Sequence, residues 1–403
     1  MAARAIERRL NADTTDYKGP HLRCPCGQEA RYVDRREKSF TTVLGQISLR
    51  RAYYHCGACG LGSCPKDVSL ALTAGSLSGG VERMVAAVGA VTSFAEGSAL
   101  LHELAGLTIE CKHVERVAES LGERVAQDEE QIVEPPRGEV PNTLYLGLDG
   151  TGVPMRNEEL AQRPGKQPDG SSKTREVKIC AIWSAEHRDA EGTPVRDVGS
   201  VTYSAAIESA AQSDTETVYP AFAQRVNREA ARRGFERASR RVVIGDGALW
   251  IWKLADEHFP GAIQIVDRFH AKEHLSDAGK AIWGPDSQLG REWTRQRHEQ
   301  LDRGDLDGIL QALAIHACAE PEAQRCGEYI RRNRHRMQYP AFHQRGLCTS
   351  TGVLEAGCKV TVGTRLKRPG MHWTVRGANA ILALRCARLS NRFQDFWQRR
   401  LAA

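Results

Sequence analysis

The spacing of apolar and polar positions changes along the chain and predicts different elements in different stretches. Between residues 40 and 55, β-branched and aromatic residues on both sides of Gly45 predict a β-hairpin that turns near this glycine. From about residue 69 to 134, apolar residues recur at helical spacing in three runs, at 81–88, 94–104 and 112–125. Three short helices are compatible with a helix-turn-helix module or with ordinary helical packing. A Pro- and Gly-containing stretch, 134–138, then resembles a linker.

Strand and helix signals alternate in the next part of the chain. Apolar runs predict strands at 143–149, 177–183, 199–205, 241–246 and 262–267, with helices at 215–233 and 249–258. Three strands, a helix and then strand–helix–strand predict a layered α/β domain whose last two strands pair in parallel. The remainder, about 271–403, is predicted to be helical. Residues 370–373 interrupt it before a last long helix that ends near residue 399.

Composition restricts the class of protein. The 403 residues are enough for two or three domains, and 41% hydrophobic with 26% charged residues is typical of a soluble globular chain. The sequence has no run of about 20 apolar residues and begins with a charged segment, so we expect neither a membrane span nor a secretory signal. A cytoplasmic protein with reduced thiols is therefore expected.

The charge of the chain permits nucleic-acid binding without demanding it. The net charge is only +6, but basic residues cluster at 331–336 and at 365–368. Such clusters can contact phosphates, although solvated helix faces and loops have the same composition.

Two aspartates stand where strand ends are predicted. Asp149 and Asp246 each follow an apolar run and precede a glycine. Ligand sites in α/β sheets form at the carboxyl ends of strands, where two neighbouring carboxylates repel each other unless a cation lies between them. Mg²⁺ or Mn²⁺ takes oxygen ligands, and two such ions about 4 Å apart support phosphoryl transfer. The alternative is that each aspartate is a turn or helix-capping residue.

These segments resemble those of bacterial insertion-sequence transposases of the DDE class, named after two aspartates and a glutamate. The resembling segments are 146–155, 165–170 with 173–178, 243–252, 266–271, and 352–357 with 370–373. The layout is similar to the ISKra branch and to Mutator-like transposases. The resemblance covers nearly the whole chain, and the combination of segments is more specific than any one of them.

The resemblance implies a fold and a set of catalytic residues. It implies an α/β, ribonuclease H-like core at 140–271, a helical insertion at 272–345 that contacts transposon DNA, and completion of the core at 346–403. Asp149, Asp246 and Glu355 would hold two Mg²⁺ or Mn²⁺ ions. From sequence alone, Glu355 has the weakest case of the three, because a glutamate at a helix start is also favoured by the helix dipole.

Further residues are candidates for supporting roles. Asp267 ends a predicted strand and is a rival of Asp246, while His270 is interpreted as an orienting or packing residue. The candidates for DNA contacts are Arg365, Lys367, Arg368, His372 and Trp373. For His372 and Trp373, packing is an open alternative.

Two cysteine pairs flank the predicted hairpin. Cys24 and Cys26 precede it, Cys56 and Cys59 follow it, and this arrangement is typical of a structural zinc ribbon. The first pair has C-x-C rather than C-x-x-C spacing, so one of its members could be replaced as a ligand. The candidate replacements are His21, His55 and Cys64. We expect region 1–68 to be a zinc-ribbon-like DNA-binding module, followed by the helical domain at 69–134.

The expected function is metal-dependent DNA hydrolysis and strand transfer at the ends of an insertion element. Expected partners are terminal inverted repeats, target DNA and further copies of the chain, on nucleoid DNA. One alternative is a domesticated regulator that binds DNA without cutting, which the presence of all three acids opposes. The other is a ribonuclease H-like nuclease without transposition, which the cysteine module and the predicted insertion oppose.

Overall fold

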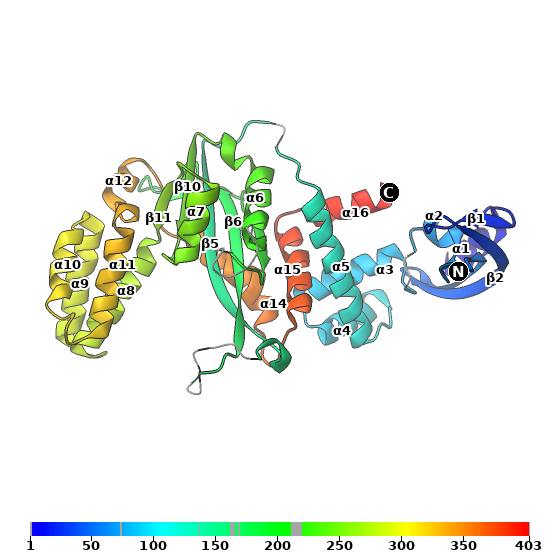
Figure 1. The fold of residues 1–403 in the computed structure, drawn as a ribbon, viewed down its shortest axis with the longest axis horizontal. Coiled ribbons are helices and arrows are strands. Elements are labelled where there is room, and N and C mark those ends of the chain that lie inside the picture. The colour runs from blue at the N-terminus through cyan, green and yellow to red at the C-terminus, as the bar shows by residue number, and fades with distance from the viewer. Residues whose placement is uncertain are drawn as a thin grey trace. The chain divides into compact units, whose positions relative to one another are not determined.

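The structure is a computed structural model, shown in Figure 1, that describes residues 2–72, 75–136, 138–161, 165, 167, 170–210 and 220–402. It is a mixed α/β protein with a cluster of four cysteines. Its contacts divide it into unit 1, Met1–Arg124 with Phe393–Ala403, and unit 2, Val125–Arg392. Of the helices among the described residues, none combines the length and apolar character needed to cross a membrane.

Unit 1 begins with a four-stranded antiparallel sheet in the order β1-β2-β3-β4. The strands are β1 (His21–Arg23), β2 (Glu29–Thr42), β3 (Gly45–His55) and β4 (Gly62–Ser63). The predicted hairpin is confirmed: Thr42 pairs with Gly45, whose φ of +116° suits glycine. β2 starts well before the predicted strand. The prediction missed its first half because charged residues on the outer face hide the apolar pattern. Phe40, Ile47 and Leu49 form a small core with apolar residues of helix α1 (Ala2–Ala12).

The predicted helices of unit 1 are also present. They are α3 (Gly79–Val91), α4 (Phe94–Ala105) and α5 (Cys111–Gln131), preceded by the short α2 (Pro65–Ser69). α4 begins with a capping box, in which Ser93 and Glu96 bond each other's backbone N–H groups, and ends at Gly106 in the left-handed conformation. The C-terminal helix α16 (Phe393–Ala402) belongs to this unit, where Arg400 pairs with the buried Glu82 at 2.6 Å.

Unit 2 contains a five-stranded sheet in the order β11-β10-β5-β6-β9. Its strands are β5 (Thr143–Pro154), β6 (Thr174–Ser184), β9 (Thr202–Ala206), β10 (Arg240–Gly245) and β11 (Ile263–Val266). β6 pairs antiparallel with β5 and β9, whereas β10 pairs in parallel with β5 and β11. The predicted parallel pairing of the last two strands is confirmed. A small ribbon of β7 (His187–Arg188) and β8 (Pro194–Val195) was too short to predict.

Helices cover both faces of this sheet. A Cβ on Gly147 of β5 would meet Leu354 of α13 (Gly352–Cys358), and one on Gly245 of β10 would meet Ile251 of α7 (Leu249–His258). Gly245 is in register with Leu148, so Gly147 and Gly245 face opposite sides. α13 and α7 therefore pack on opposite faces. α6 (Ala221–Arg233) contacts β6 and β9. Positions 215–219 of its predicted range lie outside the described residues, as do 166, 168 and 169 of the segments that resemble transposases.

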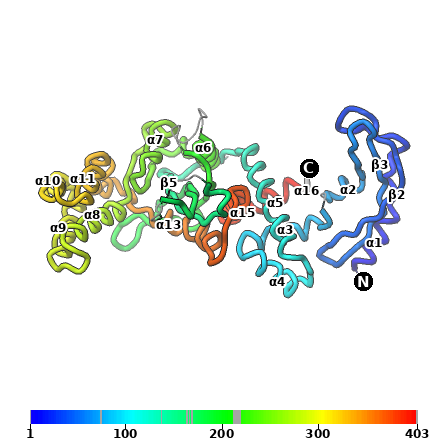
Figure 2. The backbone as a smooth tube through the Cα atoms, turned by 60° about the horizontal axis from the view of Figure 1, so that its bottom comes forward, coloured from blue at the N-terminus to red at the C-terminus, as the bar shows by residue number. Residues whose placement is uncertain are grey.

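The segment predicted as a helical insertion consists of helices, which lie beside one another in Figures 1 and 2. They are α8 (Arg268–Trp283), α9 (Gln288–Arg303), α10 (Leu306–Ala314), α11 (Pro321–Asn333) and α12 (Tyr339–Gln344). Short 3-10 turns occupy Asn157–Glu159, Phe235–Arg237 and Arg334–Arg336.

The last part of unit 2 departs from the prediction. After α13 come a π-helical turn (Lys359–Gly363), α14 (Thr364–Leu366) and α15 (Val375–Leu389). The single long helix expected up to residue 399 is wrong, because α15 ends at Leu389 and α16 starts at Phe393. Asn391 between them has a φ of +59°, a left-handed conformation that ends the helix.

Candidate functional site

Two predicted acids lie on neighbouring chain segments of the central sheet. Leu148 of β5 and Gly245 of β10 are register partners, and each is followed by one of the aspartates. Asp246 directly follows the end of β10, whereas the strand end predicted at Asp149 is wrong, because β5 continues to Pro154 in its ladder with β6. Register partners in a parallel pair point to the same face of the sheet, and side chains alternate between the faces along a strand. Both aspartates are therefore expected on the face that carries Gly147, which α13 covers. The structure therefore brings together the two acids that the sequence pattern singled out.

The carboxylate of Asp149 is held by two donors. The backbone N–H of Gly150 donates to Oδ1 at 2.7 Å, and the thiol of Cys358 donates to Oδ2 at 3.2 Å. Burial raises the pKa of Asp149, and the charge of Asp246 raises it further, against the opposing effects of Cys358, Gly150 and His270. The site thus concentrates negative charge that a cation would neutralise.

The loop that carries Asp246 is fixed by its own backbone and by a distant helix. The Oδ1 atom accepts from the backbone N–H of Ala248 at 2.9 Å, and the carbonyl oxygen accepts from the hydroxyl of Tyr329 on α11 at 2.7 Å. Gly247 has a φ of +102°, and a Cβ there would lie 2.5 Å from the ring of Tyr329. His274 of α8 also packs on Tyr329, with its ring centroid 4.1 Å from that of Tyr329.

Helix α13 brings the third acid to the same face. Leu354 is buried toward the sheet, whereas Glu355 is exposed. Gly357 permits close packing, since a Cβ there would lie 2.7 Å from the ring of Tyr203 on β9. Cys358 lies one helical turn after Glu355, and the charges of Asp149 and Glu355 both raise the pKa of its thiol in addition to the larger effect of burial.

Cys358 is the site residue that sequence reasoning missed. The available signal was its spacing of three from Glu355, which places two side chains on one helix face. Cysteine is also common as a small buried residue, so this spacing alone does not identify it as part of a site.

The three acids are an oxygen-donor set of the kind that Mg²⁺ or Mn²⁺ binds. They do not form a cluster as tight as that of the cysteines described below: among the described residues, only the cysteines form a group of three or more potential ligands within 4.8 Å of one another. The donor chemistry and the repulsion between Asp149 and Asp246 nevertheless fit a divalent cation.

Asp267 and His270 have different surroundings. Asp267 is fully buried and caps α8, accepting from the backbone N–H groups of Phe269 at 2.5 Å and His270 at 3.3 Å. Its burial favours Asp246 over Asp267 as the second acid. His270, in the first turn of α8, lies close enough to Asp149 to lower its pKa, and its Nδ1 is 3.4 Å from Glu273.

Two of the predicted DNA contacts require correction. Arg365 is fully buried with its guanidinium 5.0 Å from the ring centroid of Trp373, and Trp373 is buried with its indole N–H donating to the carbonyl of Leu366 at 2.9 Å. The guanidinium of Arg365 also donates to the sulfur of Met371 at 3.4 Å. Arg365 and Trp373 are therefore packing residues.

The other residues of this segment remain accessible. Lys367 is exposed and donates to the hydroxyl of Thr151, two residues from Asp149, at 2.5 Å. Arg368 is half-buried and His372 is exposed. In the other basic run, Arg336 is buried, 4.5 Å above the ring of Trp252, whereas Arg331 and Arg332 are exposed.

The four cysteines of unit 1 converge. The Sγ atoms of Cys24 and Cys59 are 3.6 Å apart, those of Cys26 and Cys56 are 3.7 Å apart, and all four lie within 4.8 Å of one another. A tetrahedral zinc ion with Zn–S bonds of about 2.3 Å requires sulfurs separated by roughly 3.8 Å. The cluster could therefore bind a metal such as zinc, and the C-x-C spacing does not prevent Cys24 and Cys26 from both taking part.

Local backbone geometry explains this convergence. Each cysteine pair is followed by a glycine with positive φ, Gly27 at +88° and Gly60 at +72°, which turns the chain around the sulfurs. Hydrogen bonds from backbone N–H groups lower the pKa of the Cys56 thiol to about 7, although burial opposes this shift. The N–H of Cys59 has the larger effect and that of Ala58 a smaller one. His21, which was considered as a substitute ligand, instead lies 3.4 Å from Glu29.

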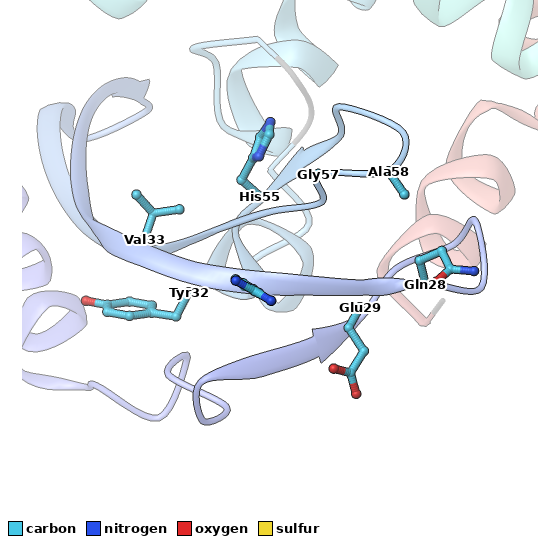
Figure 3. Close-up of a pocket in the computed structure, with 8 residues that line it drawn as sticks. Gln28, Glu29, Tyr32, Val33, His55, Gly57 and Ala58 are labelled. Atoms are coloured by element: carbon cyan, nitrogen blue, oxygen red, sulfur yellow. The ribbon is translucent and has the colours of Figure 1, made fainter.

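A hollow lies next to the cysteine cluster on the surface of the sheet in unit 1. Figure 3 shows its lining along β2 and at the end of β3. Arg31 and His55 are cross-strand partners and are both exposed there. The residues that line the hollow are Gln28, Glu29, Arg31, Tyr32, Val33, His55, Gly57 and Ala58.

Comparison with protein-family models assigns the chain to a family. The model of an uncharacterised protein family, UPF0236, matches residues 27–394, which include all three acids and the second cysteine pair, Cys56 and Cys59, whereas Cys24 and Cys26 precede the matched range. No curated protein matches the chain.

Proposed function

We propose that this chain, which belongs to the uncharacterised protein family UPF0236, is a DNA transposase of the DDE class. The observation that carries the proposal is the position of Asp149 and Asp246 directly after the register partners Leu148 and Gly245, on the face that α13 covers with Glu355. Three acids from two neighbouring strands of the sheet and one helix suit metal-dependent phosphodiester chemistry.

The sheet supports a ribonuclease H-like core. Three antiparallel strands in succession, β5, β6 and β9, are followed by β10 and β11, which add in parallel on the other side of β5. In this proposal α8 to α12 form the insertion, and Tyr329 joins it to the core through the carbonyl of Asp246.

Each acid has a proposed role at the scissile phosphate. Asp149 and Asp246 would hold two Mg²⁺ or Mn²⁺ ions together, and Glu355 would complete the second site. When bound, these ions activate a water or a 3′-hydroxyl and stabilise the leaving oxygen of an in-line displacement. Gly150 and Cys358 orient the Asp149 carboxylate within the β5 ladder, and the backbone N–H of Ala248 orients that of Asp246.

Unit 1 is the proposed DNA-recognition region, and charge supports this role. Residues 1–72 contain 12 Lys and Arg against 7 Asp and Glu, an excess of 5 out of the net +6 of the chain. Arg31 and His55, which both line the hollow, are accessible for phosphate contacts. A structural zinc ion on Cys24, Cys26, Cys56 and Cys59 would keep this surface folded.

The proposed partners are the terminal inverted repeats of an insertion element, target DNA and further copies of the chain, on nucleoid DNA in the cytoplasm. Lys367, Arg368 and His372 are the remaining proposed contacts beside the acids.

The test is cleavage of a DNA duplex that carries the end sequences flanking the gene, in Mg²⁺ or Mn²⁺. We expect the wild type to cut and to join the ends to a target, and Asp149→Asn, Asp246→Asn and Glu355→Gln to bind DNA but cut at least about 100-fold more slowly. Glu191→Gln, which changes an exposed acid near the β7–β8 ribbon, is the control and should cut normally. Tight binding without cutting would support a regulator, and cutting without joining would support a nuclease.

A further inference from the structure

Asp267 is a buried carboxylate that the proposed chemistry leaves without a role. It follows the last residue of β11 and is 0% exposed. Its backbone N–H donates to the carbonyl of Gly245 at 2.8 Å, directly before Asp246. Asp267 is thus tied to the strand end that presents the second acid.

The two carboxylate oxygens of Asp267 serve two different helices. Oδ1 accepts from the backbone N–H groups of Phe269 and His270 in the first turn of α8. Oδ2 accepts from the backbone N–H of Thr351 at 2.5 Å and from its hydroxyl. Thr351 is the N-cap residue of α13, and its carbonyl accepts from the backbone N–H of Glu355 at 2.9 Å.

One negative charge therefore lies at the N-termini of both helices that carry candidate site residues. An anion is favoured at each N-terminus by the unpaired N–H groups and by the helix dipole. His270 is three residues along α8 from Asp267, and Glu355 is four residues along α13 from Thr351, so small movements at this junction move both side chains.

We propose that Asp267 is a positioning residue that fixes His270 and Glu355 relative to Asp149 and Asp246, and that it is not a metal ligand. This inference rests on the proposed function, because it assigns Asp267 a role in that chemistry. The junction acts by orientation: displacement of a catalytic group by about 1 Å is enough to slow a reaction about 100-fold.

Substitutions can separate the two ends of the junction. In Asp267→Asn the side chain keeps its size but exchanges one acceptor oxygen for an NH₂ group, which would face an N–H donor of one of the two helices. Thr351→Val removes only the hydroxyl bond, and Thr351→Ser keeps it. Asp277→Asn, an exposed acid on α8, is the matched control.

The experiment measures three quantities on the full chain: kcat and KM for cleavage of the end duplex, Mn²⁺ affinity by electron paramagnetic resonance, and hydrogen exchange of amides 351–355. For Asp267→Asn we expect kcat about 100-fold lower, KM within about twofold, faster exchange at 351–355, and a smaller loss of Mn²⁺ affinity than in Asp246→Asn. For Thr351→Val we expect about a tenfold loss of kcat, whereas Thr351→Ser and Asp277→Asn should retain wild-type rates.

Several results would overturn the proposal. If Asp267→Asn loses as much Mn²⁺ affinity as Asp246→Asn while Thr351→Val keeps its full rate, Asp267 is a ligand. If kcat for the folded fraction and exchange at 351–355 both stay unchanged, Asp267 has no positioning role. If the wild type cuts no DNA, the transposase proposal fails, and unchanged exchange in Asp267→Asn would then separately reject the junction.

Discussion

Replacing Gly247 by alanine tests whether the loop after β10 depends on close contact with α11. The φ of +102° is a conformation that L side chains rarely adopt, and it costs a non-glycine residue about 1–2 kcal/mol. The new Cβ would also lie 2.5 Å from Cε2 and 2.9 Å from the hydroxyl oxygen of Tyr329. That ring cannot move aside easily, because it is buried and packs on His274.

Overpacking of this kind costs about 1–3 kcal/mol, so Gly247→Ala should destabilise unit 2 by about 2–5 kcal/mol in total. For a domain of this size we expect the melting temperature to fall by at least about 4 °C. Because the displaced backbone belongs to Asp246, cleavage should also slow by about tenfold or more.

The assay is thermal unfolding followed by circular dichroism, together with cleavage of the end duplex. In the Gly247→Ala/Tyr329→Ala double variant the steric part should vanish, so its loss should be smaller than the sum of the single losses. Gly138→Ala is the control, since a Cβ at Gly138 would meet no described atom within 4 Å. A melting temperature within 1 °C of wild type, with full cleavage, would refute the reasoning about this contact.

Three further predictions concern the metal, a buried charge and DNA binding. Strong chelation or Cys56→Ser should unfold the sheet of unit 1, measured as loss of bound zinc by elemental analysis and as rapid proteolysis before residue 72. A metal-free protein whose sheet resists proteolysis like the wild type would contradict the zinc assignment. Arg392→Met should destabilise the protein by about 3–5 kcal/mol in urea unfolding at pH 7, because Glu229 is fully buried with Arg392 at 3.0 Å, and an unchanged midpoint would count against this pair. Burial raises the pKa of Glu229, but the larger combined effect of Arg392, Arg232 and hydrogen bonds holds this pKa below 4.5. The stability that the ionised Glu229 contributes is therefore complete above pH 4.5 and should be lost as the pH falls further. Arg392→Met should reduce this loss. Arg31→Ala should weaken binding of DNA duplexes of any sequence and lower the salt dependence by about one ion, and selective loss for one sequence would instead indicate base reading.

Sequence periodicity located most elements because their surroundings are regular. The runs before Asp149 and Asp246 are buried on both faces, which gives continuous apolar stretches, although β5 extends past Asp149 to Pro154. The pairing of β5 with β10, which brings the two acids close, does not follow from chain order, because β6 and β9 lie between them in the sequence. By contrast, β2 carries charges on its open face, so its first half was not recognised.

The side-chain environments near the third acid could not be predicted in the same way. Arg365 lies in a basic run that has the composition of a phosphate-binding surface, but its side chain is buried in the core against Trp373. The thiol of Cys358 reaches Asp149 only because Gly357 lets α13 pack closely on the sheet. Neither the helical register after residue 358 nor this packing distance leaves a local signal in the sequence.

The hydroxyl of Tyr329 has a consequence for how the gene can change. Its bond to the carbonyl of Asp246 spans 83 positions, and α9 and α10 lie within that interval without taking part in it. Because α9 packs on α8 and α10 packs on α11, insertions would be tolerated only in the connections between these helices, where they leave that packing intact. A substitution at Gly247 would need a compensating change at Tyr329, so these two positions are expected to vary together among relatives.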